Sequence, residues 1–151
     1  MEIRAGSLGS DEDSCVRLWL DALAARDGRV DSLAVGVRAR EKFTQQIVRF
    51  AVLGRDVNGF ALTIDGGEGV ARLEMLALEV HASGRGGGRA LLADALLNAG
   101  ESGYMRFELQ VRDGNTRAIK LYESAGLSEV GIGQEHPLGG RPMLTFACCL
   151  V

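Results

Sequence analysis

The pattern of apolar and polar positions predicts short strands separated by tight turns in the middle of the chain. Apolar runs cover 50–54, 59–64 and 70–78, and the segments between them are rich in Gly, Asp and Asn. Strands divided by turns this short pair as antiparallel neighbours. We therefore expect an antiparallel meander over 50–78.

Helical spacing of apolar residues predicts two helices before this meander. Ser10 and the acidic residues after it are typical of a helix start, and Val16 and Leu20 continue the apolar stripe. A second helix is expected over 38–48, where apolar residues recur at intervals of four. A short strand at 2–5 is expected to precede the first helix.

The stretch from 73 to 99 combines a strand, a glycine-rich turn and a helix. Residues 73–78 are almost continuously apolar, which is typical of a strand covered on both faces, and Glu74 is the one carboxylate inside them. The heptapeptide SGRGGGR follows at 83–89, and apolar residues then recur at helical spacing. A glycine turn at a helix start can present backbone N–H groups to an anion, which predicts a phosphate-binding loop.

The spacing of this loop excludes two nucleotide-binding motifs. A Walker loop needs Lys-Ser or Lys-Thr after its second glycine, and the loop contains neither. A dinucleotide fingerprint that began at Gly84 would need a glycine at the position of Arg89. For the heptapeptide alone, a glycine-rich turn without a ligand is the alternative.

The rest of the chain predicts a parallel strand, a helix and a closing pair of antiparallel strands. These elements are expected at 105–111, 116–124, 129–133 and 143–150, with a loop at 134–142. The first of them forms a strand, helix, strand unit with the strand at 70–78, so these two strands should be parallel. No repeat or linker interrupts the sequence, and one domain is expected over 1–151.

Two segments together resemble the GCN5-related N-acetyltransferases. Ser83-Gly84-Arg85-Gly86-Gly87-Gly88 is similar to that family's (Gln/Arg)-x-x-Gly-x-(Gly/Ala) loop, with Ser83 and Val80 as departures where Gln or Arg and proline are usual. The segment 111–127 is similar to its V-x-x-x-N-x-x-A-x-x-x-Y-x-x-x-G-F pattern, with Leu127 in place of Phe. The resemblance implies an α/β (α+β) fold with a mixed, V-splayed sheet of six to seven strands and helices on both faces.

The resemblance also implies a site for acetyl coenzyme A. In that family the loop amides hold the pyrophosphate. By the same resemblance, Asn115 would bond the pantetheine arm, and a backbone N–H near Leu78 would stabilise the oxyanion. In that family the equivalent helix-loop-helix region helps to shape the acceptor pocket, so the poorly patterned residues 26–37 are a reasonable place for substrate specificity. The implied cofactor-binding residues are Leu76, Leu78, Ser83, Gly84, Arg85, Gly86, Gly87, Gly88, Arg89 and Asn115.

Acetyl transfer from a thioester to an amine needs a neutral amine, a stabilised oxyanion and a proton for the departing thiolate. By resemblance, Tyr122 would be the general acid. A tyrosine on an amphipathic helix usually packs its ring and sends its hydroxyl to water, which is the alternative for this residue. Asn115 could likewise be only a turn or cap residue.

Glu74 is the best candidate for the base. Desolvation in an apolar strand penalises a charged carboxylate and readies it to accept a proton. Some aminoglycoside-modifying members of the family carry Glu in a similar L-E-x-x-x-V stretch. The alternative is a structural ion pair with Arg72 or Arg106, and Glu108 is the second candidate base.

The expected function is acetyl-CoA-dependent transfer of an acetyl group to a primary amine of a small molecule or a protein. A larger acyl group and a non-catalytic acyl-CoA sensor are the alternatives. The acceptor stays open among free amino acids, polyamines, aminoglycosides, protein N-termini and lysines.

Composition and charge narrow the class of protein. The chain is 46% hydrophobic and 25% charged with a net charge of −3, so neither a nucleic-acid partner nor a membrane is expected. The first residues lack a signal-peptide pattern, and a cytoplasmic protein is expected. The cysteines and the isolated His81 and His136 suggest no metal site and no disulfide framework. A homodimer is left open.

Overall fold

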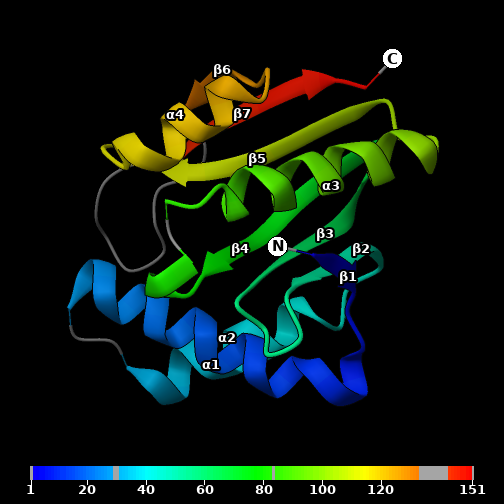
Figure 1. Cartoon of the computed structure of the whole chain (residues 1–151). Helices are drawn as coiled ribbons and strands as arrows, with labels where there is room; N and C mark the ends of the chain where they lie inside the picture. The colour runs from blue at the N-terminus through cyan, green and yellow to red at the C-terminus, as the bar shows by residue number, and fades with distance from the viewer. Residues whose placement is uncertain (1, 29–30, 83, 133–142, 151) are drawn as a thin grey trace.

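The computed structural model describes residues 2–28, 31–82, 84–132 and 143–150. Figure 1 shows how the strands and helices are arranged. In order, the elements are β1 (Ile3–Ala5), α1 (Leu8–Asp27), α2 (Ser32–Lys42), β2 (Ile47–Leu53), β3 (Gly59–Gly67), β4 (Val70–Leu78), η1 (Val80–Ala82), α3 (Gly87–Glu101), β5 (Arg106–Arg112), α4 (Thr116–Ser124), β6 (Ser128–Ile132) and β7 (Met143–Cys149).

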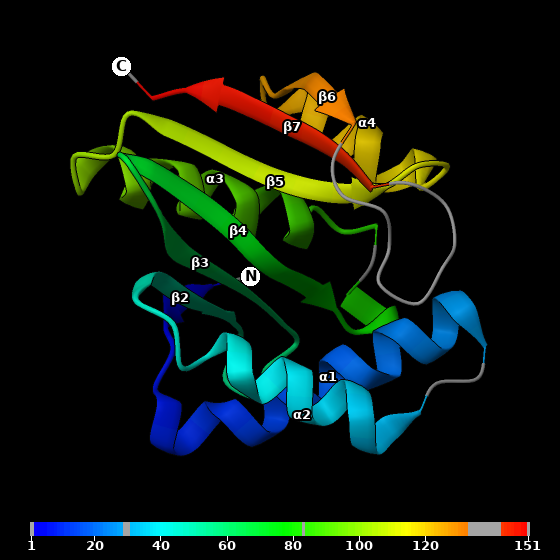
Figure 2. The same ribbon diagram turned by 180° about the vertical axis from the view of Figure 1, so that it is seen from behind.

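One seven-stranded sheet connects all of these strands, in the order β1-β2-β3-β4-β5-β7-β6. Neighbouring strands are antiparallel except β4 and β5, which α3 connects and which run parallel. Figure 2 shows β4 and β5 lying together at one end and separating toward the other. The mixed, V-splayed sheet expected from the sequence is therefore confirmed.

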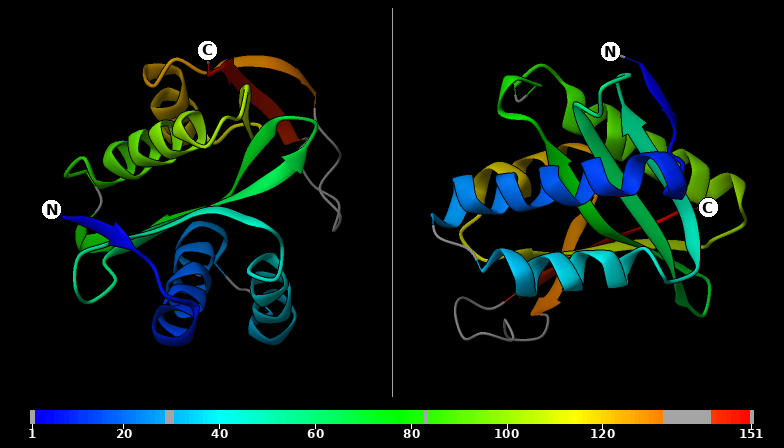
Figure 3. Two further views of the ribbon diagram at one scale, coloured as in Figure 1. Left: turned by 90° about the vertical axis from the view of Figure 1, so that its right-hand side faces the viewer. Right: turned by 90° about the horizontal axis from the view of Figure 1, so that it is seen from below.

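Helices cover both faces of the sheet (Figure 3). One hydrophobic cluster includes Val16 of α1, Ala39 of α2 and the strand residue Leu62. A second cluster, on the opposite face, includes Leu91 of α3 and Tyr122 of α4. The face covered by α1 and α2 and the face covered by α3 and α4 thus have separate cores.

A β-bulge at Glu74 changes which face of the sheet the side chains of β4 reach. In the pairing of β3 with β4, the adjacent β3 residues Thr63 and Leu62 lie opposite Leu73 and Met75. Glu74, between these two β4 residues, has no partner in β3 and is the extra residue of the bulge. Before the bulge Leu73 belongs to the core beneath α3, and after it Met75 belongs to the core beneath α1 and α2. At Glu74, therefore, the alternation of β4 side chains between the two faces of the sheet shifts by one residue.

An aromatic cluster fixes the end of α2 against the sheet. Phe43 directly follows α2 and is 3% exposed. Its ring centroid lies 5.3 Å from that of Phe50 and 6.2 Å from that of Phe60. Such pairs add ~0.5–1.5 kcal/mol to the burial of the rings themselves. The last turn of α2 is thus held in place by core packing.

Two expected boundaries were wrong. The second helix was expected over 38–48, but α2 spans Ser32–Lys42 and β2 begins at Ile47. The spacing of Phe43 and Ile47 arises because both are packed against the core beneath α1 and α2, and they belong to different elements. The first helix begins at Leu8 after an N-cap at Ser7, and Ser10 lies inside it.

The first strand of the meander begins three residues earlier than expected, at Ile47, and the other expected strands and helices lie within a few residues of the observed ones. The meander, the parallel pair and the helix at 116–124 are confirmed. The loop at 134–142, His136 and Ser83 lie outside the described residues. None of the helices in the described ranges is both long and apolar enough to cross a bilayer.

Candidate active site

The glycine-rich loop turns directly into α3. Gly84 and Gly86 have φ angles of 80° and 84°, which residues with a Cβ rarely adopt. The carbonyl of Gly86, the N-cap of α3, accepts a hydrogen bond from the N–H of Ala90 at 3.0 Å. The N–H groups of the first turn have no partner inside the helix, so they can bind an anion.

The next two glycines allow α3 to pack closely against its neighbours. A Cβ on Gly87 would lie 2.9 Å from side-chain atoms of Leu53 and Leu78. A Cβ on Gly88 would lie 3.4 Å from atoms of Leu78 and Leu121. Both glycines are buried. Because glycine has no side chain, they could contact a ligand only through backbone atoms. The same contacts bring the end of β4, the start of α3 and α4 together.

Arginines from two segments surround this loop. Arg85 and Arg89 are exposed, and so is Arg117 in the first turn of α4. The Nη2 atom of Arg117 lies 3.9 Å from the position that a Cβ on Gly84 would occupy. Sequence reasoning missed Arg117, for which the only signal was its place two residues after Asn115 in the second motif. Exposed guanidinium groups on and beside the loop favour a phosphorylated ligand.

Only the first half of β4 is paired on both sides. Its register with β5 runs from Val70 opposite Arg106 to Leu73 opposite Leu109, whereas its register with β3 continues to Leu78. Within the described residues, β4 therefore has no ladder partner on its β5 side after Leu73. A strand edge of this kind can pair with an extended ligand that carries amide groups.

Tyr122 lies on the buried side of α4. Its side chain is 9% exposed, and its ring centroid lies 6.5 Å from that of Phe146 on β7. Burial raises the pKa of Tyr122 to about 12, while the positive charge of Arg26 has a smaller, opposing effect. The phenol therefore stays protonated at neutral pH and can donate a hydrogen bond. Arg26 belongs to the last turn of α1.

Asn115 is a helix cap, which was the alternative to a pantetheine contact in the sequence analysis. Its side-chain oxygen accepts a hydrogen bond from the N–H of Ala118 at 3.4 Å, and it is the N-cap of α4. Capping places Asn115 at the start of the helix that carries Tyr122 and Arg117. Its contact with pantetheine stays a prediction.

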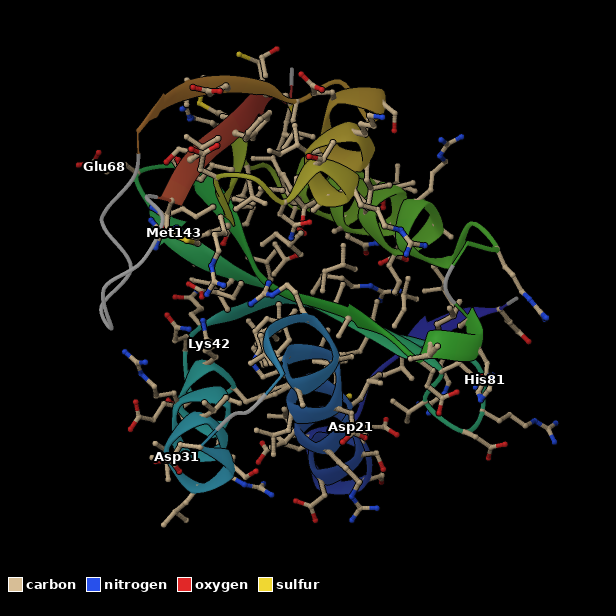
Figure 4. All side chains as sticks on the ribbon, turned by 90° about the vertical axis from the view of Figure 1, so that its left-hand side faces the viewer. Asp21, Asp31, Lys42, Glu68, His81 and Met143 are labelled. Carbon is tan, nitrogen blue, oxygen red and sulfur yellow. The ribbon has the colours of Figure 1, made fainter. Side chains whose placement is uncertain are left out.

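Glu74 follows the last residue of β4 that pairs with β5, and two cations contact its carboxylate. Its Oε2 atom accepts a hydrogen bond from Nζ of Lys42 at 3.0 Å, and its Oε1 atom lies 4.0 Å from Nη1 of Arg72. Its side chain is 16% exposed. The sequence suggested Arg72 or Arg106 as structural partners, but the shorter contact comes from Lys42. Figure 4 labels Lys42 at the end of α2 that lies closer to the sheet and Asp31 near the other end.

Glu108, the second candidate base, is shared between two arginines. Its Oε1 atom lies 3.1 Å from Nη2 of Arg72, and its Oε2 atom lies 3.6 Å from Nε of Arg106. Charges of alternating sign thus run from Lys42 through Glu74 and Arg72 to Glu108. A carboxylate held by two arginines fits a structural role.

A cavity of about 350 Å³ lies on the α1 side of the sheet. It is lined by α1, by the turn between β2 and β3, and by residues 78–81 at the end of β4. Asp21 and His81, both labelled in Figure 4, are part of its wall. Leu78 is the one residue that this cavity shares with the expected cofactor-binding residues.

The cysteines and acidic residues form no metal site in the part of the chain that the structure describes. Cys15 is buried in α1, and burial raises the pKa of its thiol to about 12. Cys148 is partly buried and Cys149 is exposed, as their adjacent positions in a strand predict. All three thiols are free.

Comparison with known proteins was made by sequence and by structure. Residues 9–127 match the family model described as the acetyltransferase (GNAT) family. No curated protein sequence matches the chain.

Several solved structures share the fold. Ribosomal-protein-S18-alanine N-acetyltransferase from Escherichia coli is 21% identical with a TM-score of 0.79, covering 99% of this chain and 93% of that chain. Ribosomal-protein-alanine N-acetyltransferase from Brucella melitensis is 20% identical with a TM-score of 0.74, covering 99% of both chains. An aminoglycoside 6'-N-acetyltransferase complexed with coenzyme A is 16% identical with a TM-score of 0.76, covering 100% of this chain and 98% of that chain. At these identities the likeness shows the fold alone.

Proposed function

The chain belongs to the acetyltransferase (GNAT) family, and we propose on this basis that it transfers an acetyl group from acetyl-CoA to a primary amine. The observation that carries the proposal is the end of the β4–β5 pairing at Leu73 and Leu109. It leaves a free strand edge that leads to an anion-binding helix start. A phosphorylated, amide-containing ligand matches both features.

The chain's own groups fit such a ligand in two places. The free N–H groups at the start of α3, with Arg85, Arg89 and Arg117 around them, suit phosphates. The free edge at Leu76 and Leu78 suits the amides of a pantetheine arm. When bound, acetyl-CoA supplies the activated thioester.

Tyr122 is proposed as the group that donates a proton or hydrogen bond to the departing sulfur. Its raised pKa keeps the phenol protonated over the whole physiological range. A thiol has a pKa of about 8.5, so complete transfer from a phenol as weak as Tyr122 is unfavourable in the resting site. Tyr122 therefore acts chiefly through a hydrogen bond that strengthens as negative charge develops on sulfur.

Glu74 is proposed as the proton acceptor for the incoming ammonium. It lies at the bulge where β4 leaves β5 and already accepts a hydrogen bond from an ammonium group, that of Lys42. An acceptor amine that replaces Lys42 would meet the same carboxylate oxygen. Glu74→Gln keeps the shape of the side chain and removes this acceptor.

A coenzyme A sensor without turnover is the second candidate. The pairing of Glu74 with Lys42 and Arg72 favours it, because a carboxylate held by two cations is also a structural element. The two candidates agree on cofactor binding and differ on turnover. Both are therefore tested by one pair of experiments.

Binding is measured by titration calorimetry with coenzyme A. Arg117→Ala should weaken binding several-fold because it removes a cation beside Gly84, and the effect should shrink at high salt. Arg55→Ala, which removes an exposed arginine in the β2–β3 turn, is the matched control. If the parent does not bind coenzyme A, both candidate functions are wrong.

Turnover is measured as thiol release from acetyl-CoA with a panel of amines. The panel contains amino acids, polyamines, aminoglycosides, and peptides with a free N-terminus or an internal lysine. Amine-dependent thiol release that Glu74→Gln slows supports the transferase. Tight binding of acetyl-CoA without thiol release for any amine supports the sensor.

A further inference from the structure

Lys42 carries a primary amine that contacts the proposed proton acceptor. Its Nζ atom donates to Oε2 of Glu74 at 3.0 Å, and its side chain is only 32% exposed. Glu74 follows the last residue of β4 that pairs with β5. Lys42 therefore places an ammonium group where the proposed function needs the ammonium of an acceptor.

The backbone of Lys42 is fixed by packing. The next residue, Phe43, is 3% exposed and belongs to the aromatic cluster with Phe50 and Phe60. Lys42 also ends α2, where the helix dipole favours a positive charge. The amine is thus delivered by an anchored helix end and is not a freely moving surface group.

We propose that Lys42 is a self-acetylation site of this protein, an inference that rests on the proposed function. The ammonium passes one proton to the Glu74 carboxylate along the existing hydrogen bond. The neutral amine attacks the thioester carbon of acetyl-CoA, the new C–N bond forms, and the C–S bond breaks. Coenzyme A leaves as the thiol after its sulfur takes up the second proton that the nitrogen loses, and Glu74 releases the first proton to solvent. The products are one acetyl-lysine, one free thiol and one proton.

Acetylation would remove the charge that holds Glu74. An acetyl-lysine cannot form the ion pair, so among the described residues Glu74 keeps the 4.0 Å contact with Arg72 as its one ion pair. The modified protein then has a Glu74 side chain open to an external amine. Conversely, an external amine bound at Glu74 shields Lys42 from acetylation.

The chain provides its own control for the experiment. Lys42 and Lys120 are its only lysines, and Lys120 is exposed on α4. The purified protein is incubated with acetyl-CoA, and acetylation of each lysine is followed by peptide mass spectrometry. Because Lys42 reacts within one molecule, it should be acetylated on the order of 10²-fold faster than Lys120. Equal rates for the two lysines would overturn the proposal.

Three variants separate self-acetylation from chemical acetylation. Lys42→Arg keeps the charge and should leave only the slow reaction at Lys120. Glu74→Gln and Tyr122→Phe should slow acetylation of Lys42 and leave Lys120 unchanged. A Lys42 rate that neither variant lowers would overturn the proposal.

Reaction within one molecule is tested with isotopes. Unlabelled parent is mixed with ¹⁵N-labelled Tyr122→Phe protein, and acetyl groups should appear on Lys42 of the unlabelled chains only. The rate constant should not depend on protein concentration. Labelled acetyl-Lys42 that forms at the parent's rate would overturn the assignment of a reaction within one chain.

The ion pair is checked without any acetyl donor. The ¹⁵Nζ signal of Lys42 should shift in Glu74→Gln while that of Lys120 stays in place, and an unchanged Lys42 signal would overturn the proposal. A failure of the self-acetylation proposal can be distinguished from a failure of the proposed function. Absence of coenzyme A binding overturns both, whereas amine-dependent thiol release with an unmodified Lys42 overturns only the self-acetylation.

Discussion

The two halves of β4 have similar apolar sequences but different surroundings. The half from Val70 to Leu73 pairs with β3 on one side and β5 on the other. In the half from Glu74 to Leu78, the residues after the bulge pair with β3, and among the described residues this half has no ladder partner in β5. The first half is a central strand of the sheet, whereas the second half is a strand edge inside the molecule.

Because of this difference, we expect the first half of β4 to contribute mainly to stability and the second half mainly to ligand binding. Backbone groups of the first half are satisfied by two neighbouring strands, so its side chains serve the core. Backbone groups on the free side of the second half are available to a ligand. The bulge at Glu74 marks the boundary. Lys42 donates a hydrogen bond to the Glu74 carboxylate, and Tyr122 belongs to the same hydrophobic cluster as Leu76 and Leu78. Substitutions in the two regions should therefore have different consequences.

The largest effect is expected from Tyr122→Phe, which removes the hydroxyl proposed to bond the departing sulfur. The fold and the affinity for coenzyme A should persist, while kcat falls by ~10²-fold to 10⁴-fold, the range for one acid group. Steady-state thiol release with an accepted amine measures it. Tyr104→Phe is the matched control, because Tyr104 bonds Asp65 and lies in the loop before β5. Equal kcat in both variants would make Tyr122 a packing residue.

The next effect concerns the paired half. Leu73 is 6% exposed, and Leu73→Ala should lower the free energy of unfolding by ~2–5 kcal/mol through lost burial and a cavity. Leu76→Ala, in the free half, should cost roughly 1 kcal/mol because Leu76 is only partly buried. Urea unfolding measures the first quantity, and calorimetry should show that Leu76→Ala weakens coenzyme A binding more. A reversed order would remove the distinction between the halves.

Alkaline pH offers a smaller test of the burial of Tyr122. The pKa of this phenol is about 12 in the folded protein and about 10 when unfolded. Its stabilising contribution is fully present below about pH 10 and is lost as the pH rises through the folded value. Between about pH 9 and pH 11 the parent should lose roughly 1.4 kcal/mol more than Tyr122→Phe. Urea unfolding at the two pH values checks this, and equal losses would show that the phenol is solvated.

The smallest effect is expected at Thr63, which pairs with Leu73 just before the bulge. Its hydroxyl is buried and has no hydrogen-bond partner among the described residues. Thr63→Val keeps the shape and removes the unpaired group, so it should stabilise the fold by about 1 kcal/mol. Thermal unfolding measures the gain. A loss of stability would mean that a water or a ligand group satisfies the hydroxyl.

The sequence by itself determined most of the elements and the family. Glycine turns, helical apolar spacing and the two motifs predicted the meander, the parallel pair and the loop before α3, because these features arise from local backbone preferences. Asn115 could be recognised as a cap for the same reason. The boundary of α2 was missed because Phe43 and Ile47 are spaced as in a helix yet meet the same core from different elements.

Only the tertiary structure decided which charges surround the candidate site. Lys42 reaches Glu74 across 32 residues of sequence, and Arg117 reaches the loop because α4 lies beside the start of α3. The bulge at Glu74 likewise depends on the register between β3 and β4. No local pattern encodes these contacts. They follow from how the sheet and its helices pack, which brings together side chains that the chain holds far apart.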